Sequence, residues 1–330
     1  SGTYEIAKIL LSDSAFIMNK DVESLKRKTG KDYYPIYTQE DVDKCLNYWN
    51  EYDFEYSINL DEEIKFNFMP SGHIINSAQI ELFIKAGNSV KKIGYTSDLG
   101  GKLPKYYITK FKPIKNANVI IGESTYSNKL RNCNNKDRKN DLIKIKSIIE
   151  ETCKINKSKV LISSFALDRT QNILTFLYDL FSEDRDCPII LIDSPMACKI
   201  TKLYEQLLHE EELIKYKKIL NWNKLKLIED YETSKLFQQS KEPMIIISCS
   251  GMMTSGRSVT WASKLLSNPN NCILFIGFST QNSLAYKIKQ GKSKTIKIDG
   301  KQIPNKCRII DLKSFSSHMQ YDDLIKYYSN

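Results

Sequence analysis

Histidine is scarce in this chain of 330 residues, which contains only three. His73, His209 and His318 therefore leave few imidazoles for metal binding or acid–base chemistry. The eight cysteines are scattered without a C-x-x-C pair, and several lie inside apolar runs, for example Cys249 and Cys272. This distribution is typical of buried thiols in a reducing cytoplasm, and it argues against a disulfide framework or a thiolate zinc site.

Long apolar runs are absent as well. No stretch approaches the ~18–20 residues needed to cross a bilayer, and residues 1–5 lack the basic and apolar regions of a signal peptide. We therefore expect a cytoplasmic protein with no membrane partner. The chain does not begin with methionine, which predicts that it is processed, tagged or a fragment. With 41% hydrophobic residues it has ample material for folded cores, and its length predicts about two domains.

Basic residues outnumber acidic ones. Lys and Arg total 49 against 39 Asp and Glu, which gives a net charge of +10. A basic chain favours a polyanionic partner such as nucleic acid. The charge is a weak indication by itself, because enrichment in Lys and Asn can reflect the base composition of a genome.

The first part of the chain predicts helices followed by an antiparallel sheet. Residues 4–18 and 39–48 have the apolar spacing of helices, with a Lys-rich loop between them and Thr38 as a suitable N-cap of the second. Three further segments alternate apolar and polar residues as half-buried antiparallel strands do, namely residues 63–68, 79–84 and 90–95. Residues 119–121 are continuously apolar, which predicts a strand buried on both faces.

After the charged residues 128–141 the pattern changes to short apolar strands that alternate with helices. The strands expected here are residues 159–163, 188–192, 244–248 and 272–276. Between the first two lies a helical stripe, and Asp168 with Gln171 three residues later predicts the capped start of that helix. Such alternation is typical of a parallel, doubly wound sheet. The fold class is therefore α/β, with an antiparallel-sheet domain up to about Tyr126 followed by an α/β domain.

Candidate chemical groups follow the ends of these strands. His73 lies in a loop directly before an alternating strand, and Asp98 lies just past a strand end, where a carboxylate can reach a neighbouring loop. An isolated histidine is more often a hydrogen-bonded or surface residue, and an aspartate in such a place is more often a turn residue. His318 precedes an apparent helix, where a hydrogen bond at the helix start is its simplest role. His209 belongs to an amphipathic helix and is interpreted as part of a solvated face.

Two elbows follow buried strands and carry small, hydroxylated and basic residues. In residues 248–257 the amides, the hydroxyls and Arg257 are suited to cradle a phosphate at the start of a helix, although a tight turn explains the same residues. Residues 163–171 occupy the equivalent place after their own strand. Neither elbow is a Walker or G-x-G-x-x-G motif. Together they predict a surface for a nucleic-acid backbone, with the candidate substrate-binding residues Ser250, Gly251, Thr254, Ser255, Arg257 and Arg169.

Seven short segments, spread over nearly the whole chain, match the ordered motifs of one enzyme family. Residues 72–78 (G-H-I-I-N-S-A) resemble a histidine motif G-H-I-L-G-S-A, residues 96–98 (T-S-D) an aspartate motif S-G-D, and residues 122–126 (G-E-S-T-Y) an acidic motif E-S-T-Y. The other matches are residues 163–174, 193–197, 250–258 and 315–318. The set resembles the β-CASP branch of the metallo-β-lactamase-fold nucleases, which cut RNA or, in some members, DNA. The residues of these motifs resemble those of the bacterial and archaeal ribonucleases more than those of the eukaryotic polyadenylation nuclease.

This resemblance implies a partial metallo-β-lactamase αββα domain with an inserted β-CASP domain, which is a parallel, Rossmann-like sheet flanked by helices. Residues 1–127 would form the incomplete lactamase-like part. Residues 128–314 would form the β-CASP domain, and residues 315–330 would return to the first domain.

The resemblance also implies hydrolysis of RNA phosphodiester bonds by a zinc-bound hydroxide. His73 and Asp98 would be ligands of a site for two Zn²⁺ ions, with Asp98 bridging them. Glu123 would orient a zinc-ligating histidine, and His318 would act as general acid or position the scissile phosphate. The implied partner is single-stranded RNA. The oligomeric state stays open, a homodimer included.

Two metal motifs of the family lie outside the sequence, because H-x-H-x-D-H would precede residue 1 and a V-H-G-E-type motif would follow residue 330. An open zinc site takes about three protein ligands, whereas His73 and Asp98 are two. We therefore expect a ribonuclease in the full-length protein, and neither stable zinc binding nor cleavage by this chain alone. Smaller departures, such as Asp168 in place of glycine, remove no ligand. A non-catalytic RNA-binding or scaffold homologue and a DNA-processing nuclease remain as alternatives.

Overall fold

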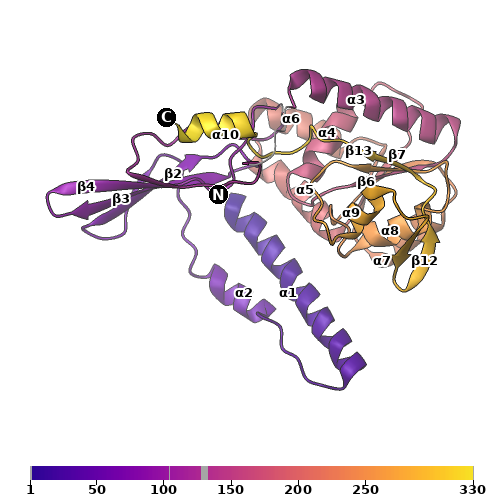
Figure 1. Ribbon diagram of the computed structural model, residues 1–330, viewed down its shortest axis with the longest axis horizontal. Coiled ribbons are helices and arrows are strands. Elements are labelled where there is room, and N and C mark those ends of the chain that lie inside the picture. The colour runs from indigo at the N-terminus through magenta and orange to yellow at the C-terminus, as the bar shows by residue number, and fades with distance from the viewer. Residues whose placement is uncertain (1, 104, 128–132, 330) are drawn as a thin grey trace. The chain divides into compact units, whose positions relative to one another are not determined.

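The computed structural model describes residues 2–103, 105–127 and 133–329, and these residues form two compact units (Figure 1). The first unit comprises Ser1–Leu99 and Thr109–Glu123, and the second comprises Gly100–Ile108 and Ser124–Asn330. The domain boundary expected at residue 128 falls on residues 128–132, which lie outside the described residues. The assignment of domains by family layout therefore stays a prediction.

The segment Gly100–Ile108 groups with the second unit because its aromatic residues pack there. The backbone N–H of Tyr106 donates to Oδ1 of Asn172 at 2.8 Å, and the hydroxyl of Tyr107 lies 2.5 Å from that of Thr175. The end of the chain groups with the second unit as well, where the ring of Phe315 packs edge-on against Phe176.

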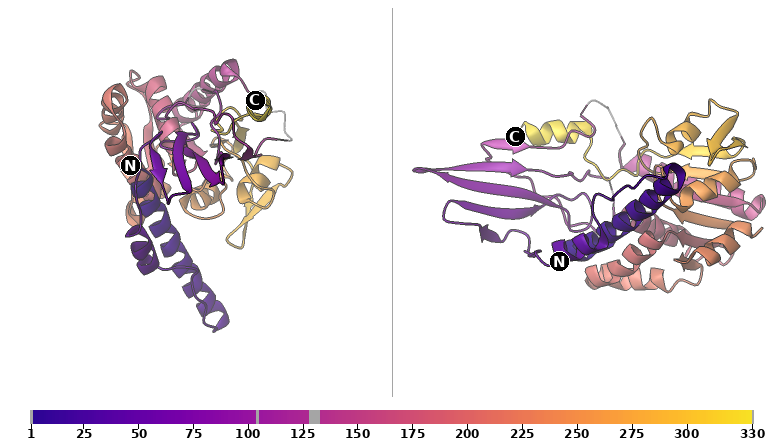
Figure 2. Two further views of the ribbon diagram at one scale, coloured as in Figure 1. Left: turned by 90° about the vertical axis from the view of Figure 1, so that its left-hand side faces the viewer. Right: turned by 90° about the horizontal axis from the view of Figure 1, so that it is seen from below.

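The sheet of the first unit has five strands in the order β1-β2-β3-β4-β5. Their bounds are β1 (Ser57–Asn59), β2 (Ile64–Pro70), β3 (Ala78–Ala86), β4 (Ser89–Tyr95) and β5 (Val119–Ile121). The strands β1 to β4 pair in antiparallel fashion, as the alternating sequences of β2 to β4 predicted, whereas β5 pairs with β4 in parallel. The short strand β1 was not predicted. Figure 2 shows these strands side by side in its right-hand view.

The burial predicted for β5 is wrong. Val119 and Ile121 are 52% and 56% exposed, although the run is continuously apolar. The strand is the last in the order of its sheet, so β4 is its only strand neighbour among the described residues. A continuously apolar run therefore does not by itself establish burial, because burial depends on how many neighbours cover a strand.

The helices of the first unit are α1 (Gly2–Thr29) and α2 (Gln39–Leu46), which pack together around Ala15. As predicted, Thr38 caps α2. Its Oγ1 accepts from the backbone N–H of Asp41 at 3.3 Å, and the carboxylate of Asp41 accepts from the N–H of Thr38 at 2.8 Å. The Lys-rich loop expected at residues 26–31 is helical up to Thr29, and the basic residues in the last turn of α1 complement the negative end of the helix dipole.

The second unit is built on a six-stranded sheet in the order β13-β10-β6-β9-β7-β8, in which all neighbours are parallel. Its strands are β6 (Lys159–Ser163), β7 (Ile189–Asp193), β8 (Leu225–Ile228), β9 (Met244–Ser248), β10 (Cys272–Phe275) and β13 (Arg308–Asp311). A separate hairpin is formed by β11 (Thr295–Ile298) and β12 (Lys301–Pro304). The predicted α/β class and parallel sheet are confirmed.

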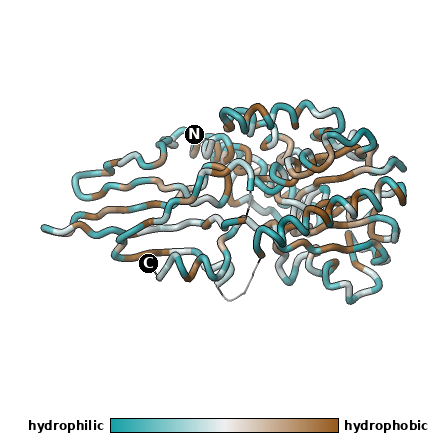
Figure 3. Tube along the Cα trace, turned by 90° about the horizontal axis from the view of Figure 1, so that it is seen from above, coloured by the Kyte–Doolittle hydropathy of each residue, from teal (hydrophilic) through white to brown (hydrophobic). Residues whose placement is uncertain are grey.

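Helices cover both faces of this sheet (Figure 1). They are α3 (Asn135–Ile149), continued by the π-helix η1 (Glu150–Ile155), α4 (Arg169–Phe181), α5 (Pro195–Leu207), α6 (Glu210–Leu220), α7 (Tyr231–Gln239), α8 (Arg257–Leu265) and α9 (Leu284–Gln290). The helix α10 (Tyr321–Tyr328) follows near the end of the chain and does not belong to these layers. On one face, Leu161 and Ile246 pack against Trp261 of α8 and Ile288 of α9. Figure 3 shows the resulting concentration of hydrophobic residues in the strands of this unit. None of the described helices combines the length and the apolar character needed to cross a bilayer.

Candidate active site

His73 and Asp98, the two predicted metal ligands, lie close together in the first unit. The distance from Nε2 of His73 to Oδ2 of Asp98 is 3.8 Å. The register of the sheet explains this proximity, because Pro70 at the end of β2 pairs with the start of β3, and Tyr95 at the end of β4 pairs with Ile80 of β3. The loop after β2 and the segment after β4 therefore emerge at the same edge of the sheet.

The loop that carries His73 is held by its own hydrogen bonds. The Oγ of Ser77 accepts from the backbone N–H groups of His73 and Ile74 at 3.0 and 3.1 Å. The preceding Gly72 has a φ of +68°, and a Cβ there would lie 3.0 Å from the Cβ of Phe111. Glycine is therefore required at this position, and the backbone presents His73 in one defined orientation.

Glu123 fixes the backbone directly after Asp98. Its Oε1 accepts from the N–H of Leu99 at 2.5 Å, and its own N–H donates to Oγ1 of Thr96 at 3.2 Å. The carboxylate of Asp98 itself is 59% exposed, whereas the side chain of His73 is only 14% exposed. Glu123 therefore acts on Asp98 through the backbone, which adds to the histidine-orienting role that the resemblance implied.

His318 lies in the second unit, in the segment before α10. It forms an antiparallel bridge with Gly100, and the N–H of Gly101 donates to the carbonyl of Ser317 at 3.0 Å. A Cβ on Gly101 would lie 2.7 Å from the carbonyl oxygen of His318, so only glycine fits there. The ring of Tyr126 meets that of His318 edge-on, with their centroids 5.9 Å apart. The imidazole is thus fixed from both its backbone and its ring.

A buried polar network supports the His318 segment through the neighbouring Ser317. The carboxylate of Asp168 accepts from Oγ of Ser317 and from Nδ2 of Asn172, each at 3.1 Å. Arg169 donates to the same Oγ of Ser317 at 3.3 Å and to the carbonyl of Ile276 at 2.8 Å. The residue before His318 is therefore bound to both an acidic and a basic side chain.

The capping role predicted for Asp168 is wrong. Its side chain makes no cap hydrogen bond to α4, and its backbone φ is +64°. The amide of Gln171 donates to the carbonyl of Ala166 and to Thr201 instead. A left-handed conformation is strained for aspartate, and glycine stands at this position in the family motif. The hydrogen bonds of the carboxylate offset that strain.

Lys105 joins this network, because its Nζ donates to the carbonyl of Ser317 at 3.0 Å. Burial lowers the pKa of the Lys105 ammonium to about 8, and the carboxylate of Asp168 opposes part of this shift. Burial in turn raises the pKa of Asp168, which Arg169 and Lys105 oppose. The network therefore holds two ionisable groups whose charged forms depend on each other.

We expect the substitution Lys105→Met to change how stability depends on pH. An unfolded lysine has a pKa of ~10.4, so between about pH 8 and that value the unfolded chain binds more protons and wild-type stability rises with pH. Below about pH 8 the cost of burying the charge is present in full, so methionine should help most there. Urea denaturation at about pH 7 and about pH 10 measures the difference. An equal difference between variant and wild type at both pH values would contradict this expectation.

The two elbows lie beside each other at the carboxyl ends of β6 and β9. The Oγ of Ser163 donates to the carbonyl of Gly251 at 2.9 Å. Within the elbow of residues 248–257, Oγ of Ser250 accepts from the N–H of Thr254 at 3.1 Å, and Thr254 and Ser255 are exposed. Five of the six candidate substrate-binding residues therefore lie on one elbow, where Thr254 and Ser255 are exposed, and the sixth, Arg169, lies on the other elbow.

Arg257 points away from that exposed surface. Its guanidinium donates to Oδ1 of Asp193 at 2.6 Å and to the carbonyls of Ile228 and Glu229 at 2.9 and 2.6 Å. Its side chain is 15% exposed and that of Asp193 is fully buried. We therefore assign Arg257 a structural role, in contrast to the phosphate contact expected from the sequence.

Comparison with known proteins finds one matching family model and several similar proteins. Residues 170–288 match the model of the Beta-Casp domain. Ribonuclease TTHA0252 of Thermus thermophilus is 27% identical over 301 residues, which are 88% of this chain and 66% of that protein. An RNase J-like protein of Methanocaldococcus jannaschii is 29% identical over 339 residues, which are 96% and 70% of the two chains. These similarities support assignment of the chain to the β-CASP family of metallo-β-lactamase-fold nucleases.

A further β-CASP relative carries a different name. The transcription termination factor FttA of Methanocaldococcus jannaschii is 24% identical over 334 residues, which are 96% of this chain and 50% of that protein. The chain therefore spans between half and about 70% of the lengths of these relatives. The matched residues 170–288 lie within the second unit, which holds the parallel sheet.

The chemistry of His73 and Asp98 fits a metal ion such as zinc, which takes imidazole nitrogen and carboxylate oxygen. Bonds of ~2.0–2.2 Å to a tetrahedral ion place two ligand atoms ~3.3–3.6 Å apart, close to the 3.8 Å found here. The exposure of Asp98 leaves room for substrate beside the pair. These two residues form a candidate metal site.

Sequence reasoning missed Lys105, which lies in a segment without a motif. The only sequence signal is a lysine next to the aromatic pair Tyr106 and Tyr107. Its contact with Ser317 joins residues separated by 212 positions. Burial of this lysine is therefore a property of the folded second unit that no local pattern reveals.

Proposed function

We propose that the chain is the substrate-binding and partial catalytic region of a metal-dependent ribonuclease that hydrolyses RNA phosphodiester bonds. The observation that carries the proposal is the pair His73 and Asp98, whose ligand atoms lie 3.8 Å apart at one edge of the sheet. The names of two relatives, a ribonuclease and an RNase J-like protein, support RNA as the substrate. The net charge of +10 suits a polyanion.

In this proposal, His73 and Asp98 hold divalent metal, with zinc as the expected ion. When bound, such an ion supplies charge stabilisation at a phosphoryl oxygen and a lower pKa for water. Glu123 keeps the Asp98 segment in place through the N–H of Leu99. Because an open zinc site takes about three protein ligands, we propose that stable binding and cleavage require ligands in addition to these two.

His318 is the proposed general acid, which donates a proton to the departing ribose oxygen or positions the scissile phosphate. An imidazole suits this task because it exchanges protons near neutral pH. Its segment is fixed by Gly100, by the ring of Tyr126 and, through Ser317, by Asp168. This support favours one orientation of the imidazole, which general acid catalysis requires.

We expect RNA cleavage by the full-length gene product to depend on metal. End-labelled RNA and DNA of one sequence are incubated with the protein, with chelator, and with chelator followed by excess Zn²⁺ or Mn²⁺. RNA should shorten only where metal is present, and DNA should stay intact. Elemental analysis of this chain alone should show less than one zinc per chain. In the same cleavage assay, this chain alone should leave the RNA intact.

The other outcomes separate the alternatives. Cleavage that persists in chelator would overturn the metal-dependent mechanism. Cleavage of DNA in preference to RNA would identify a DNA-processing nuclease. RNA binding without cleavage by the metal-loaded full-length product would identify a non-catalytic scaffold. Stoichiometric zinc in this chain alone would contradict the expectation that His73 and Asp98 need further ligands.

A further inference from the structure

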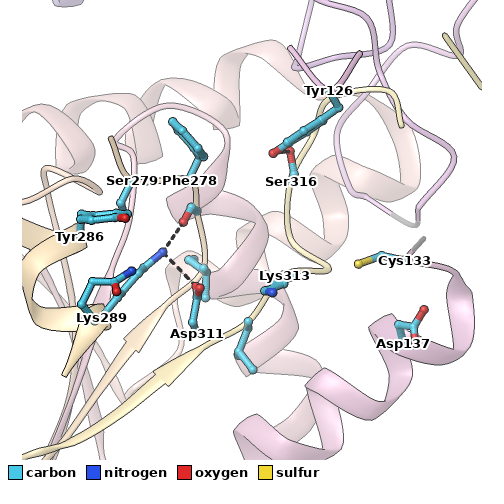
Figure 4. A pocket seen from close by; sticks show the side chains of 14 residues that line it. Tyr126, Cys133, Asp137, Phe278, Ser279, Tyr286, Lys289, Asp311, Lys313 and Ser316 are labelled. Atoms are coloured by element: carbon cyan, nitrogen blue, oxygen red, sulfur yellow. Dashed lines mark hydrogen bonds and ion pairs between the residues drawn. The ribbon is translucent and has the colours of Figure 1, made fainter. Parts of the chain in front are cut away.

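A cavity of about 620 Å³ lies in the second unit and shares Tyr126 with the surroundings of His318. Its size is that of pockets for small organic groups, ~300–1,000 Å³. Its wall combines aromatic, hydroxyl and basic side chains, among them Tyr126, Phe278, Ser279, Tyr286, Lys289 and Lys313. Figure 4 shows Phe278, Ser279 and Tyr286 gathered on one side of the cavity, and Tyr126 with Ser316 on the other.

Ser279 is the first observation that indicates a ligand. The residue is 7% exposed, and its Oγ has no hydrogen-bond partner among the described residues. An unsatisfied buried hydroxyl costs ~1–3 kcal/mol. Because Ser279 lines the cavity, a ligand group there can both donate to and accept from this hydroxyl.

Phe278 is the second observation. The ring is 51% exposed although it is large and apolar, and it lines the cavity beside Tyr286. Exposed aromatic faces in nucleic-acid-binding proteins stack on unpaired bases, and each stacked base contributes ~1–3 kcal/mol. A flat heteroaromatic group that also hydrogen-bonds to Ser279 matches this wall.

The charges of the wall argue against a small anion as the occupant. The ammonium of Lys289 is held by Asp311 at 2.9 Å and by the carbonyl of Gly277 at 2.9 Å. Lys313 and Asp137 add one charge of each sign to the wall, so the two lysines and two aspartates balance. A neutral base therefore fits the interior better than a phosphate does. Lys313 is exposed, and its ammonium can contact a phosphate outside the cavity.

We infer that this cavity holds one unpaired nucleobase of the RNA strand, stacked on Phe278 and hydrogen-bonded to Ser279, with an adjoining phosphate near Lys313. The inference rests on RNA being the substrate in the proposed function. Tyr126 connects the cavity with the proposed general acid, because it lines the wall and its ring meets that of His318 at 5.9 Å. The base bound here therefore selects which part of the strand lies near His318.

The test measures binding of a fluorescent single-stranded RNA to this chain by anisotropy. Phe278→Ala should weaken binding about tenfold, within the ~5- to 150-fold range that stacking of one base implies. Phe278→Trp should restore binding, and Ser279→Ala should change the preference among the four bases. The matched control is Tyr231→Ala, since Tyr231 is 66% exposed in the same unit and does not line the cavity. It should bind like wild type.

Strands with a single abasic position locate the contact. For the wild-type chain, RNA affinity should fall when the abasic position replaces the one base that the cavity holds. For Phe278→Ala, the abasic position should not change the affinity. If Phe278→Ala binds RNA like Tyr231→Ala, the inference is wrong while RNA binding and the proposed function stand. If wild type binds no RNA, both fail. If AMP or UMP binds in a Phe278-dependent way and RNA does not compete, the cavity serves a free nucleotide and the inference is overturned.

Discussion

Replacing Asp98 with asparagine is expected to lower RNA cleavage by the full-length product more than about a hundredfold. Loss of groups that merely orient metal ligands costs ~10–100-fold, and the loss of a ligand should exceed that. Asparagine keeps the size of the side chain and removes its charge. Because the carboxylate is 59% exposed and lies outside the core, the fold should not change.

The measurement is single-turnover cleavage of end-labelled RNA, with RNA affinity and the unfolding transition recorded for the same preparations. Asp53→Asn is the matched control, because Asp53 is an exposed aspartate of the same unit. His73→Ala should lower cleavage as Asp98→Asn does. If Asp98→Asn cleaves RNA as fast as Asp53→Asn does, Asp98 is not a metal ligand.

The candidate pair could be predicted from the sequence because short motifs place both residues at strand ends. The antiparallel register does the rest, since Pro70 pairs with Ala78 and Tyr95 with Ile80. Alternation along β2 to β4 is a local property, and it was sufficient to predict their pairing. Residue identity and local period thus determine this part of the molecule.

Features that depend on distant partners could not be predicted in the same way. The exposure of β5 depends on its place at the end of the strand order, which no three-residue pattern encodes. Asp168 was expected to cap a helix, but its partner Ser317 is 149 positions away. The cavity beside Phe278 likewise assembles segments that are separated along the chain, from Tyr126 to Ser316.

Arg257 shows how one residue type permits two roles. A basic side chain in an elbow at a helix start predicts a phosphate contact. Its guanidinium instead meets Asp193, 64 positions away along the chain. The same carboxylate accepts from Nε1 of Trp261 at 2.6 Å and from Oγ of Ser234 at 2.7 Å. Asp193 is therefore a buried anion with Arg257 as its cation, and the two roles of Arg257 lead to different experiments.

We expect Arg257→Ala to lower the free energy of unfolding of the second unit by ~3–5 kcal/mol, because it leaves a buried charge without its partner. The matched control is Arg308→Ala. Arg308 meets Glu151 at the same 2.6 Å, but both side chains are 42% or more exposed, so ~0–1 kcal/mol is expected. Adding Asp193→Asn to Arg257→Ala should recover part of the loss, since it removes the uncompensated charge.

Urea denaturation followed by tryptophan fluorescence measures these differences, because Trp261 is fully buried beside Asp193. RNA affinity as a function of salt distinguishes the two roles of Arg257. If the role of Arg257 is structural, Arg257→Ala should lower stability and leave the slope of log affinity against log salt unchanged under conditions where the variant is folded, because a guanidinium engaged by Asp193 and two carbonyls has few donors left for RNA. Unchanged stability with a slope smaller by about one phosphate contact would instead establish the phosphate role.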